Sequence, residues 1–159
     1  MIRHVIRQFV VQTLYQMEVG HLSREEAIEN IEEMVADLKE EAVELSKEDL
    51  TAESLTEFNR KFELDAYYFE CVDGVLEHLE HLDMTIEANL HGWALSRLNK
   101  VDKAILRLAT YEMAFMSDTS NEIIINEALE LTKAFSDTGD GKARSFNNKV
   151  LDQINKYLT

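Results

Sequence analysis

The chain has 159 residues, 45% of them apolar, with one cysteine, no proline and a formal net charge of −15. This length allows one compact domain or two small bundles, and the absence of proline favours helices joined by short connections. Such acidity argues against non-specific binding to nucleic acid if it is spread evenly, while the single Cys71 excludes an internal disulfide and suits a reducing cytoplasm.

The charge is unevenly distributed. Residues 1–17 hold two bases and no acid, residues 18–90 hold 22 acids and 5 bases, and residues 91–159 hold 9 of each. The acidity therefore belongs to the middle of the chain. The two ends can form a different surface if they pack together.

Apolar residues at helical spacing predict the elements of the first half. Residues 3–18 form the first predicted helix, and its frequent polar residues exclude a signal peptide and a membrane span. Ser23 and Glu26 have the spacing of a capping box, which predicts a long helix with a narrow apolar stripe and an acidic outer face. Thr51 is a candidate N-cap for a short helix, and another helix is predicted over 65–82.

A looser stretch, 84–98, precedes three more predicted helices. Asn99 predicts the N-cap of a helix over about 101–116, and Ser120 or Asn121 predicts the N-cap of the next, over about 122–136. The last helix is predicted over about 144–158. We therefore predict an all-α fold of about seven helices, a single domain over 1–159 with an extended acidic segment at about 22–65.

The segment FSDTGDGKARSFNNKV, residues 135–150, invites comparison with phosphate and calcium loops. Ala143 follows Lys142 where a phosphate loop needs Ser or Thr. A calcium loop that begins at Asp137 would need Glu at its twelfth position, which is Asn148. Two hypotheses remain: a plain turn between helices, or a basic helix start that meets an anion through backbone N–H groups and side chains.

Metal and catalytic sites have no support in the sequence. His78, His81 and His91 each lack the glutamate three residues before them that a carboxylate-bridged bundle site requires. Cys71 lies in an apolar helical stripe, which is typical of a core residue, and nucleophile motifs are absent. We therefore predict no enzyme activity, no catalytic residue, no metal and no cofactor.

Arg3, Arg7 and Tyr15 lie within about 120° of one another on the first predicted helix, roughly away from its apolar side. This edge is either a solvated face or a surface for single-stranded RNA, where guanidinium groups meet phosphates and aromatic rings stack on bases. The residues alone leave both hypotheses open.

Four blocks of sequence together resemble the NusB family of transcription antitermination factors. They are RQFVVQTLYQME (7–18), WALSRLNKVDKAILRLATYEM (93–113), IINEALELTKAF (124–135) and FNNKVLDQI (146–154). The resemblance implies two small packed helical bundles. It also implies binding to the single-stranded boxA element of ribosomal RNA leader transcripts, together with the small-subunit ribosomal protein NusE. The pair would act in the RNA polymerase antitermination complex and promote read-through of terminators, with no chemical reaction.

The family pattern and the bases of the acid-poor turn supply the candidate contacts. The candidate RNA-binding residues are Arg3, His4, Arg7, Phe135, Lys142, Arg144, Phe146 and Asn148, with the two phenylalanines as stacking platforms. The candidate contacts for the protein partner are Tyr15 and Asp102. Asn147 and Lys149 depart from the apolar residue and the glycine of the family, and the basic N-terminal cluster is short. We therefore expect the partner to supply part of the RNA-binding surface.

Two alternatives belong to other classes. A helical protein-interaction module without direct RNA contact is favoured by the acidic middle segment. NusB-like domains also occur fused to RNA methyltransferases, but a chain that ends at Thr159 leaves no room for a methyl-donor domain. We expect a cytoplasmic protein with no membrane partner, and the resemblance leaves a homodimer of the free protein possible.

Overall fold

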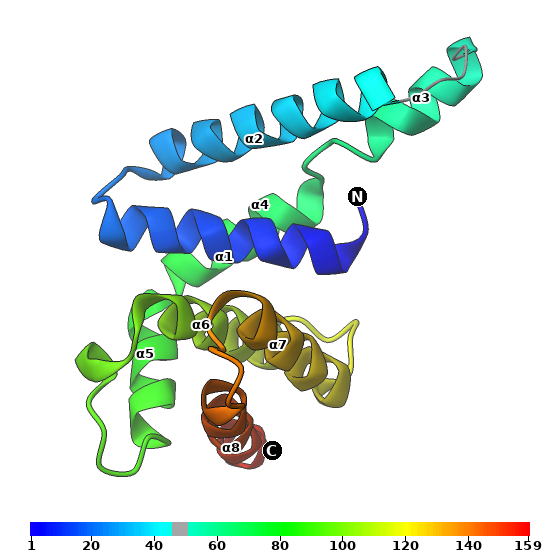
Figure 1. The fold of residues 1–159 in the computed structure, drawn as a ribbon. Helices are drawn as coiled ribbons and strands as arrows, with labels where there is room; N and C mark the ends of the chain where they lie inside the picture. Colours follow the sequence, from blue (N-terminus) through cyan, green and yellow to red (C-terminus); the bar gives the residue numbers. More distant parts are fainter. Residues whose placement is uncertain (46–50) are drawn as a thin grey trace. The chain divides into compact units, whose positions relative to one another are not determined.

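The computed structural model describes residues 1–45 and 51–159, which form eight α-helices and one short 3-10 helix (Figure 1). In chain order these are α1 (Arg3–Val19), α2 (Arg24–Leu45), α3 (Ala52–Arg60), α4 (Ala66–Glu77), α5 (Leu79–Ala88), η1 (Leu95–Arg97), α6 (Lys100–Phe115), α7 (Asn121–Phe135) and α8 (Lys142–Leu158). These residues contain no strand. The predicted all-α fold is therefore confirmed.

The helix count exceeds seven because the helix predicted over 65–82 is two helices. The backbone of His78 leaves the helical region, with φ −103° and ψ 17°, and separates α4 from α5. The apolar spacing runs through this break, so periodicity alone does not reveal it. The second helix, α5, then extends to Ala88, into the stretch that was expected to be looser.

The helices begin at the capping residues that the sequence predicts. Ser23 Oγ accepts the N–H of Glu26 at 3.1 Å, and Glu26 Oε1 accepts the N–H of Ser23 at 3.3 Å, which completes the capping box. Thr51, Asn99 and Ser120 each accept the N–H three residues further on, at the starts of α3, α6 and α7. Each bond satisfies an N–H group that a helix start leaves without a helical partner.

The chain divides into two compact units, Met1–Glu70 and Cys71–Thr159. In the first unit α1 packs against α2. The buried apolar residues of these two helices are Ile6, Phe9, Val10, Val11, Leu14, Ala27, Ile28, Ile31 and Val35. The first turn of α4 joins this unit through Tyr68, whose hydroxyl lies 2.6 Å from Thr13 Oγ1. Hydrophobic burial and a satisfied polar pair therefore hold the unit together.

The acidic face of α2 is exposed, as predicted, but its apolar stripe is only partly covered. Ile28, Ile31 and Val35 are buried, while Met34 and Leu38 are 38% and 45% exposed. A cavity of about 350 Å³ adjoins this helix and is lined by Glu32, Val35, Ala36, Lys39, Phe62, Glu63, Leu64 and Phe69. The outer part of α2 thus combines acids with exposed apolar side chains.

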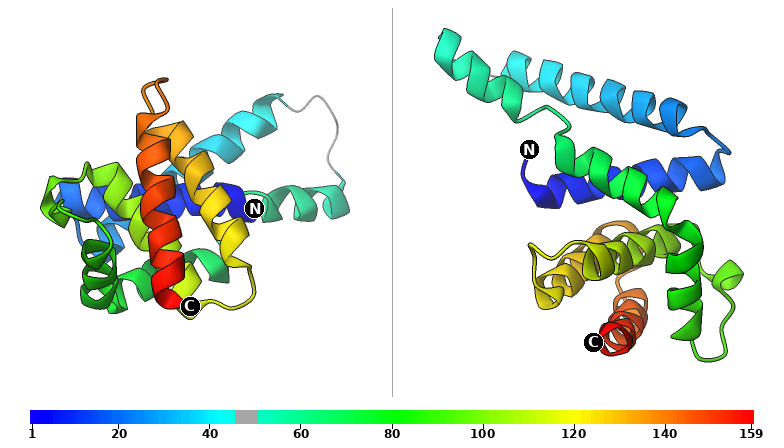
Figure 2. Two further views of the ribbon diagram at one scale, coloured as in Figure 1. Left: turned by 90° about the horizontal axis from the view of Figure 1, so that it is seen from below. Right: turned by 180° about the vertical axis from the view of Figure 1, so that it is seen from behind.

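In the second unit, α6, α7 and α8 pack on one another and α5 packs against α6 and α8 (Figure 2). The largest fully buried side chains of these helices are Leu82, Ile86, Ile105, Leu106, Leu108, Ile124, Leu131, Leu151 and Ile154. Cys71 is fully buried, which confirms it as a core residue. This unit supplies a rigid frame for the turn between α7 and α8.

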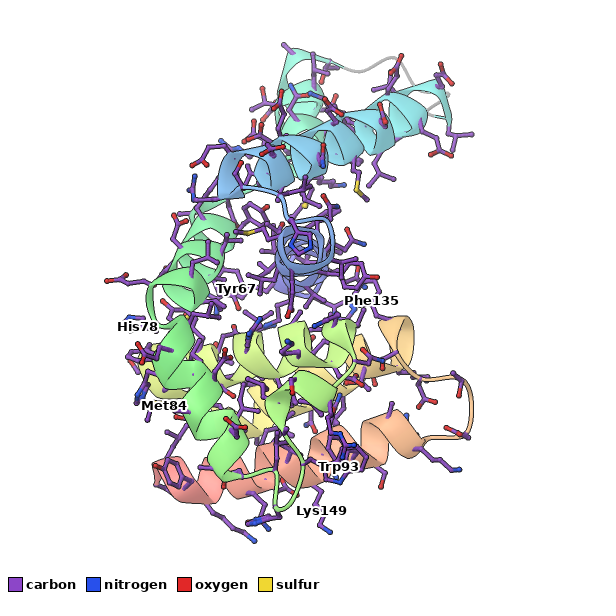
Figure 3. The ribbon with its side chains drawn as sticks, turned by 90° about the vertical axis from the view of Figure 1, so that its left-hand side faces the viewer. Tyr67, His78, Met84, Trp93, Phe135 and Lys149 are labelled. Carbon is purple, nitrogen blue, oxygen red and sulfur yellow. The ribbon has the colours of Figure 1, made fainter. Side chains whose placement is uncertain are left out.

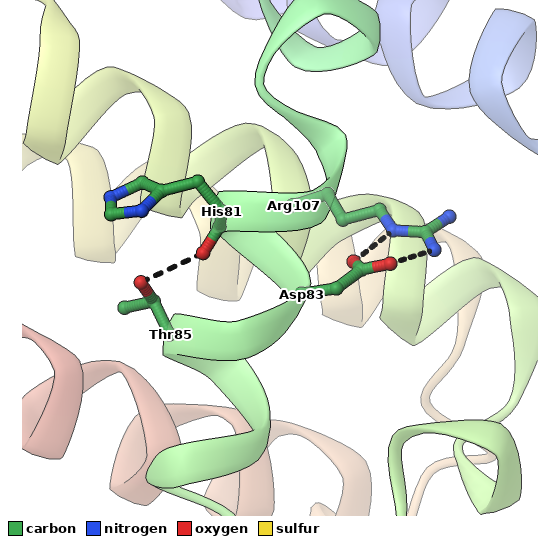
Figure 4. A network of polar contacts seen from close by, with 4 residues as sticks. All are labelled: His81, Asp83, Thr85 and Arg107. Carbon is green, nitrogen blue, oxygen red and sulfur yellow. Dashed lines mark hydrogen bonds and ion pairs between the residues drawn. The ribbon is translucent and has the colours of Figure 1, made fainter.

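An ion pair links α5 to α6. Arg107 Nε and Nη2 donate to the two carboxylate oxygens of Asp83, each at 2.8 Å, while Thr85 Oγ1 on α5 donates to the carbonyl of His81 at 2.9 Å (Figure 4). The Arg107 and Asp83 side chains are 13% and 25% exposed. A bidentate pair fixes orientation as well as distance, so it sets the register of these two helices.

Candidate nucleic-acid interface

Two of the N-terminal candidates lie over one aromatic ring. The guanidinium carbons of Arg3 and Arg7 are 4.5 and 5.6 Å from the ring centroid of Tyr67, distances that allow a cation–π interaction. Arg3 is exposed, but Arg7 is only 4% exposed. The predicted shared face of Arg3, Arg7 and Tyr15 away from the core is therefore wrong for Arg7. Tyr15 itself is 37% exposed.

His4 is half-buried and its Nε2 lies 3.4 Å from Gln8 Nε2, one helical turn further along α1. The imidazole of His4 and the side-chain amide of Gln8 therefore lie on the same face of α1.

The turn between α7 and α8 is shaped by two aspartates. Gly139 and Gly141 have φ of 101° and 72°, values that glycine adopts without strain. Asp137 Oδ1 accepts the N–H groups of Gly139 and Gly141 at 2.9 and 3.1 Å, and Asp140 Oδ1 accepts that of Lys142 at 3.0 Å. The chain's own carboxylates therefore occupy these three N–H groups. An anion contact through the basic side chains of the helix start stays a prediction.

The start of α8 presents bases without acids. Lys142, Arg144, Asn148 and Lys149 are exposed, and residues 141–151 include no Asp or Glu. The helix begins at Lys142, two residues earlier than predicted, because Gly141 in the left-handed region ends the turn. Exposed basic side chains in the first turn of a helix suit phosphate groups.

The ring of Phe146 pairs with that of Trp93, which was not among the candidate site residues predicted from the sequence. Its ring and that of Trp93 are edge-to-face, with centroids 6.3 Å apart and an interplanar angle of 67°. Phe146 is half-buried, whereas Trp93 is 53% exposed. Both side chains line a cavity of about 230 Å³ together with Asn89, Leu90, His91, Lys149, Val150 and Gln153.

The two predicted stacking platforms are separate. Phe135 is half-buried at the end of α7, and Figure 3 shows it apart from Trp93 and from Lys149 of α8. Because Phe146 pairs with Trp93 and not with Phe135, we expect the two phenylalanines to meet different nucleotides.

Asp102 is held by its neighbours in the second unit. Its N–H donates to Asn99 Oδ1 at 3.0 Å, and its Oδ1 accepts a hydrogen bond from Asn147 Nδ2 at 3.1 Å. The same Asn147 nitrogen donates to Thr132 Oγ1 at 3.0 Å. Asp102 is half-buried, so the structure confirms its place at the helix start and adds a link to α8.

Sequence reasoning did not assign roles to Asn147, Trp93 and Lys149. Asn147 and Lys149 were noticed as departures from the family pattern, and Lys149 also as one of the bases of the segment 135–150, yet Asn147 is a fully buried link and Lys149 lines the aromatic cavity. Local sequence offered no signal for Trp93, because tryptophan is highly buried on average.

Within the described ranges, no three His, Cys, Asp or Glu side chains gather in a way that could hold a metal ion. In the same residues, every helix is too short or too polar to cross a membrane.

Comparisons with known proteins identify the family. The model of the NusB family matches residues 4–156. The transcription antitermination protein NusB of Geobacillus kaustophilus is 34% identical over 156 residues, which covers 98% of this chain and 97% of the relative. The structure of NusB from T. maritima has a TM-score of 0.68 and 28% identity, with 98% of this chain and 92% of that chain covered.

A second structural neighbour shares the fold. It is a crystal structure of antitermination factors NusB and NusE in complex with double-stranded RNA. The TM-score is 0.69 at 22% identity, with 99% of each chain covered. With the family match spanning nearly the whole chain, the chain belongs to the NusB family.

Proposed function

We propose that this protein is a cytoplasmic transcription antitermination factor that binds the boxA element of ribosomal RNA leader transcripts together with NusE. The family match over residues 4–156 supports the biological role, and its relatives include transcription antitermination proteins. A structural neighbour is a complex of NusB and NusE with RNA. The role is one of binding: the complex would join RNA polymerase and promote read-through, and no chemical step is required.

The observation that carries the RNA proposal is the exposed, acid-free start of α8 beside an aromatic pair. Lys142 and Arg144 would neutralise phosphates, and Phe146 and Asn148 would meet bases. Phe135 would meet a different nucleotide. This surface lies within residues 91–159, which hold equal numbers of acidic and basic residues. The excess of acidic residues lies in a different part of the sequence, residues 18–90.

The N-terminal helix would supply the second group of RNA contacts. Arg3 is exposed over Tyr67 and would reach a phosphate, with His4 as its neighbour. Arg7 is buried, so we propose that it acts by holding Tyr67 in place rather than by direct phosphate contact.

NusE would meet Tyr15 and Asp102. Tyr15 is exposed on α1, and large aromatic residues are enriched in protein interfaces. Asp102 is held by the two hydrogen bonds described above, so its carboxylate is oriented before a partner binds. A homodimer of the free protein would compete with NusE if it used the same surface.

An anisotropy titration with boxA RNA and a scrambled control, with and without NusE, at two salt concentrations tests the proposal. We expect boxA to bind more tightly than the control, and more tightly still when NusE is present. Equal affinity for the two RNAs in the presence of NusE would contradict the RNA role. Equal boxA affinity with and without NusE would contradict the shared surface.

A helical interaction module without RNA contact is the second candidate, and α2 favours it. Exposed acids beside Met34, Leu38 and the 350 Å³ cavity suit a basic, partly apolar protein segment. The double substitution Arg3→Ala and Arg144→Ala separates the candidates. If it leaves boxA binding unchanged while NusE still binds, the interaction module is the better description.

A further inference from the structure

We infer that the cavity between Trp93 and α8 is a subsite for one unstacked nucleotide of the bound RNA, with Trp93 as its stacking surface. This inference rests on the proposed RNA-binding function and adds residues to it. Trp93, Lys149 and Gln153 are the additions, while Phe146 is shared with the proposed interface.

The exposure of Trp93 is the first observation. Apolar surface as large as an indole is normally buried, yet 53% of Trp93 is accessible in a unit with a well-filled core. The backbone that carries it is unusual as well: His91 and Gly92 have φ of 42° and 95°, in the left-handed region. A non-glycine residue in this region is uncommon and marks a local constraint. The constrained loop thus holds the indole at the rim of the cavity.

The composition of the cavity is the second observation. Leu90 and Val150 are buried, 4% exposed each, and form its apolar lining. Phe146 meets the Trp93 ring edge-to-face rather than face-to-face, so it holds the indole from one side without stacking on it. Bases stack on aromatic side chains of proteins that bind single strands because every base has a π-face. The cavity therefore matches the apolar part of a nucleotide.

The polar groups at the cavity match the rest of a nucleotide. The Gln153 amide offers a donor and an acceptor, which can pair with a base edge. Lys149 brings an exposed ammonium group that can meet a phosphate. Figure 3 shows Trp93 on the same part of the unit as Lys149 of α8. Stacking, edge recognition and charge neutralisation are thus supplied within one cavity.

The charge of the lining favours RNA over an apolar side chain from a partner protein. The residues that line this cavity include no carboxylate, and Lys142 lies one helical turn before Phe146 on the same side of α8. The cavity beside α2, in contrast, is lined by two acids, Glu32 and Glu63, and one base, Lys39. The charge of the lining therefore favours a polyanion at the first of these cavities over the second.

The chain itself supplies the probe, because Trp93 is its only tryptophan. We expect boxA RNA to quench the Trp93 fluorescence of the full chain bound to NusE, with Trp93→Phe in the same complex as the background. RNAs with one abasic nucleotide, moved stepwise along boxA, should lose the quenching at one position. The abasic series compares different RNAs on the native chain, so the only variant that it needs is the Trp93→Phe background.

Substitution supplies the second measurement. Trp93→Ala should weaken boxA binding by roughly 5- to 150-fold, the loss expected for one stacked base, while Trp93→Phe should retain most of the affinity. Tyr157→Ala is the matched control, because Tyr157 is an aromatic residue of α8 that is 62% exposed and does not line the cavity. Lys149→Ala and Gln153→Ala should each weaken binding less than Trp93→Ala.

The outcomes separate the subsite from the proposed function. If the native complex binds boxA but Trp93 fluorescence is unchanged, or Trp93→Ala binds normally, the subsite is wrong and the function stands. If Trp93→Ala weakens NusE binding and leaves RNA affinity intact, the cavity holds a partner side chain and the inference is overturned. If the native complex does not distinguish boxA from a scrambled RNA, the proposed function itself fails.

Discussion

Asn147 Nδ2 donates to Asp102 Oδ1 at 3.1 Å and to Thr132 Oγ1 at 3.0 Å, and so joins α8 to both α6 and α7. Asn147 is fully buried, and its Oδ1 has no hydrogen-bond partner. An amide in this position both stabilises the helix contacts and leaves one polar atom unsatisfied. It also orients the carboxylate that we propose for the partner contact.

We predict that Asn147→Ala lowers the free energy of unfolding by about 1–3 kcal/mol, because the substitution removes the shared donor from Asp102 and Thr132. Urea denaturation measures the change. Asn148→Ala, the exposed neighbour, should stay within about 0.5 kcal/mol. Equal stability of the two variants would show that the Asn147 bonds contribute nothing net.

Gly74 lies against the ring of Tyr111. A Cβ built at Gly74 would be 2.1 Å from Tyr111 Cζ and 2.2 Å from its hydroxyl oxygen. Gly74→Ala should therefore lower the free energy of unfolding by about 1–3 kcal/mol through overpacking. In an open helix the same change raises stability by roughly 0.5–1 kcal/mol, so the sign alone is decisive in a denaturation experiment. Against a Tyr111→Ala background, the second substitution should become neutral or stabilising.

The bidentate pair of Arg107 and Asp83 should show measurable coupling. In a double-mutant cycle with alanine at both positions, we expect a coupling free energy of about 1–3 kcal/mol from thermal or urea unfolding. Arg24 and Glu25 provide the control, since their oxygen and nitrogen are 3.5 Å apart and the side chains are 36% and 77% exposed. Surface pairs of this kind couple weakly. A similar coupling free energy in both pairs would contradict the conclusion that the Arg107–Asp83 pair sets the register of α5 and α6.

The start of α8 should set part of the salt dependence of RNA binding. Each lost phosphate contact to a single strand reduces the slope of log K against log salt by about 0.7. Lys142→Ala combined with Arg144→Ala should therefore reduce the slope by about 1.4 in the presence of NusE. Lys156→Ala, an exposed base in the last turn of the same helix, is the control and should leave the slope unchanged. An unchanged slope in the double variant would show that Lys142 and Arg144 do not contact the phosphates of the RNA.

Much of the helical framework is predictable from local sequence. Ser23 with Glu26, and the lone caps Thr51, Asn99 and Ser120, bond to N–H groups three residues away, so the signal and its consequence lie within one turn. The break at His78 was missed because apolar residues on both of its sides keep the same spacing. The placement of Arg7 was missed because the partner of its guanidinium, Tyr67, lies 60 residues away in sequence.

In the candidate site, too, local features were predictable from the sequence and contacts between distant residues were not. The sequence by itself determined the helices, the concentration of acids in the middle of the chain and the bases around the last turn, because spacing, capping and charge are local properties. Only the tertiary structure decided that Trp93 meets Phe146 and that Asn147 bonds Asp102, while the local structure of the turn decided that aspartates occupy its N–H groups. The aromatic and amide pairs join distant residues. The turn depends on side-chain rotamers and on left-handed glycines, whose geometry composition alone does not specify.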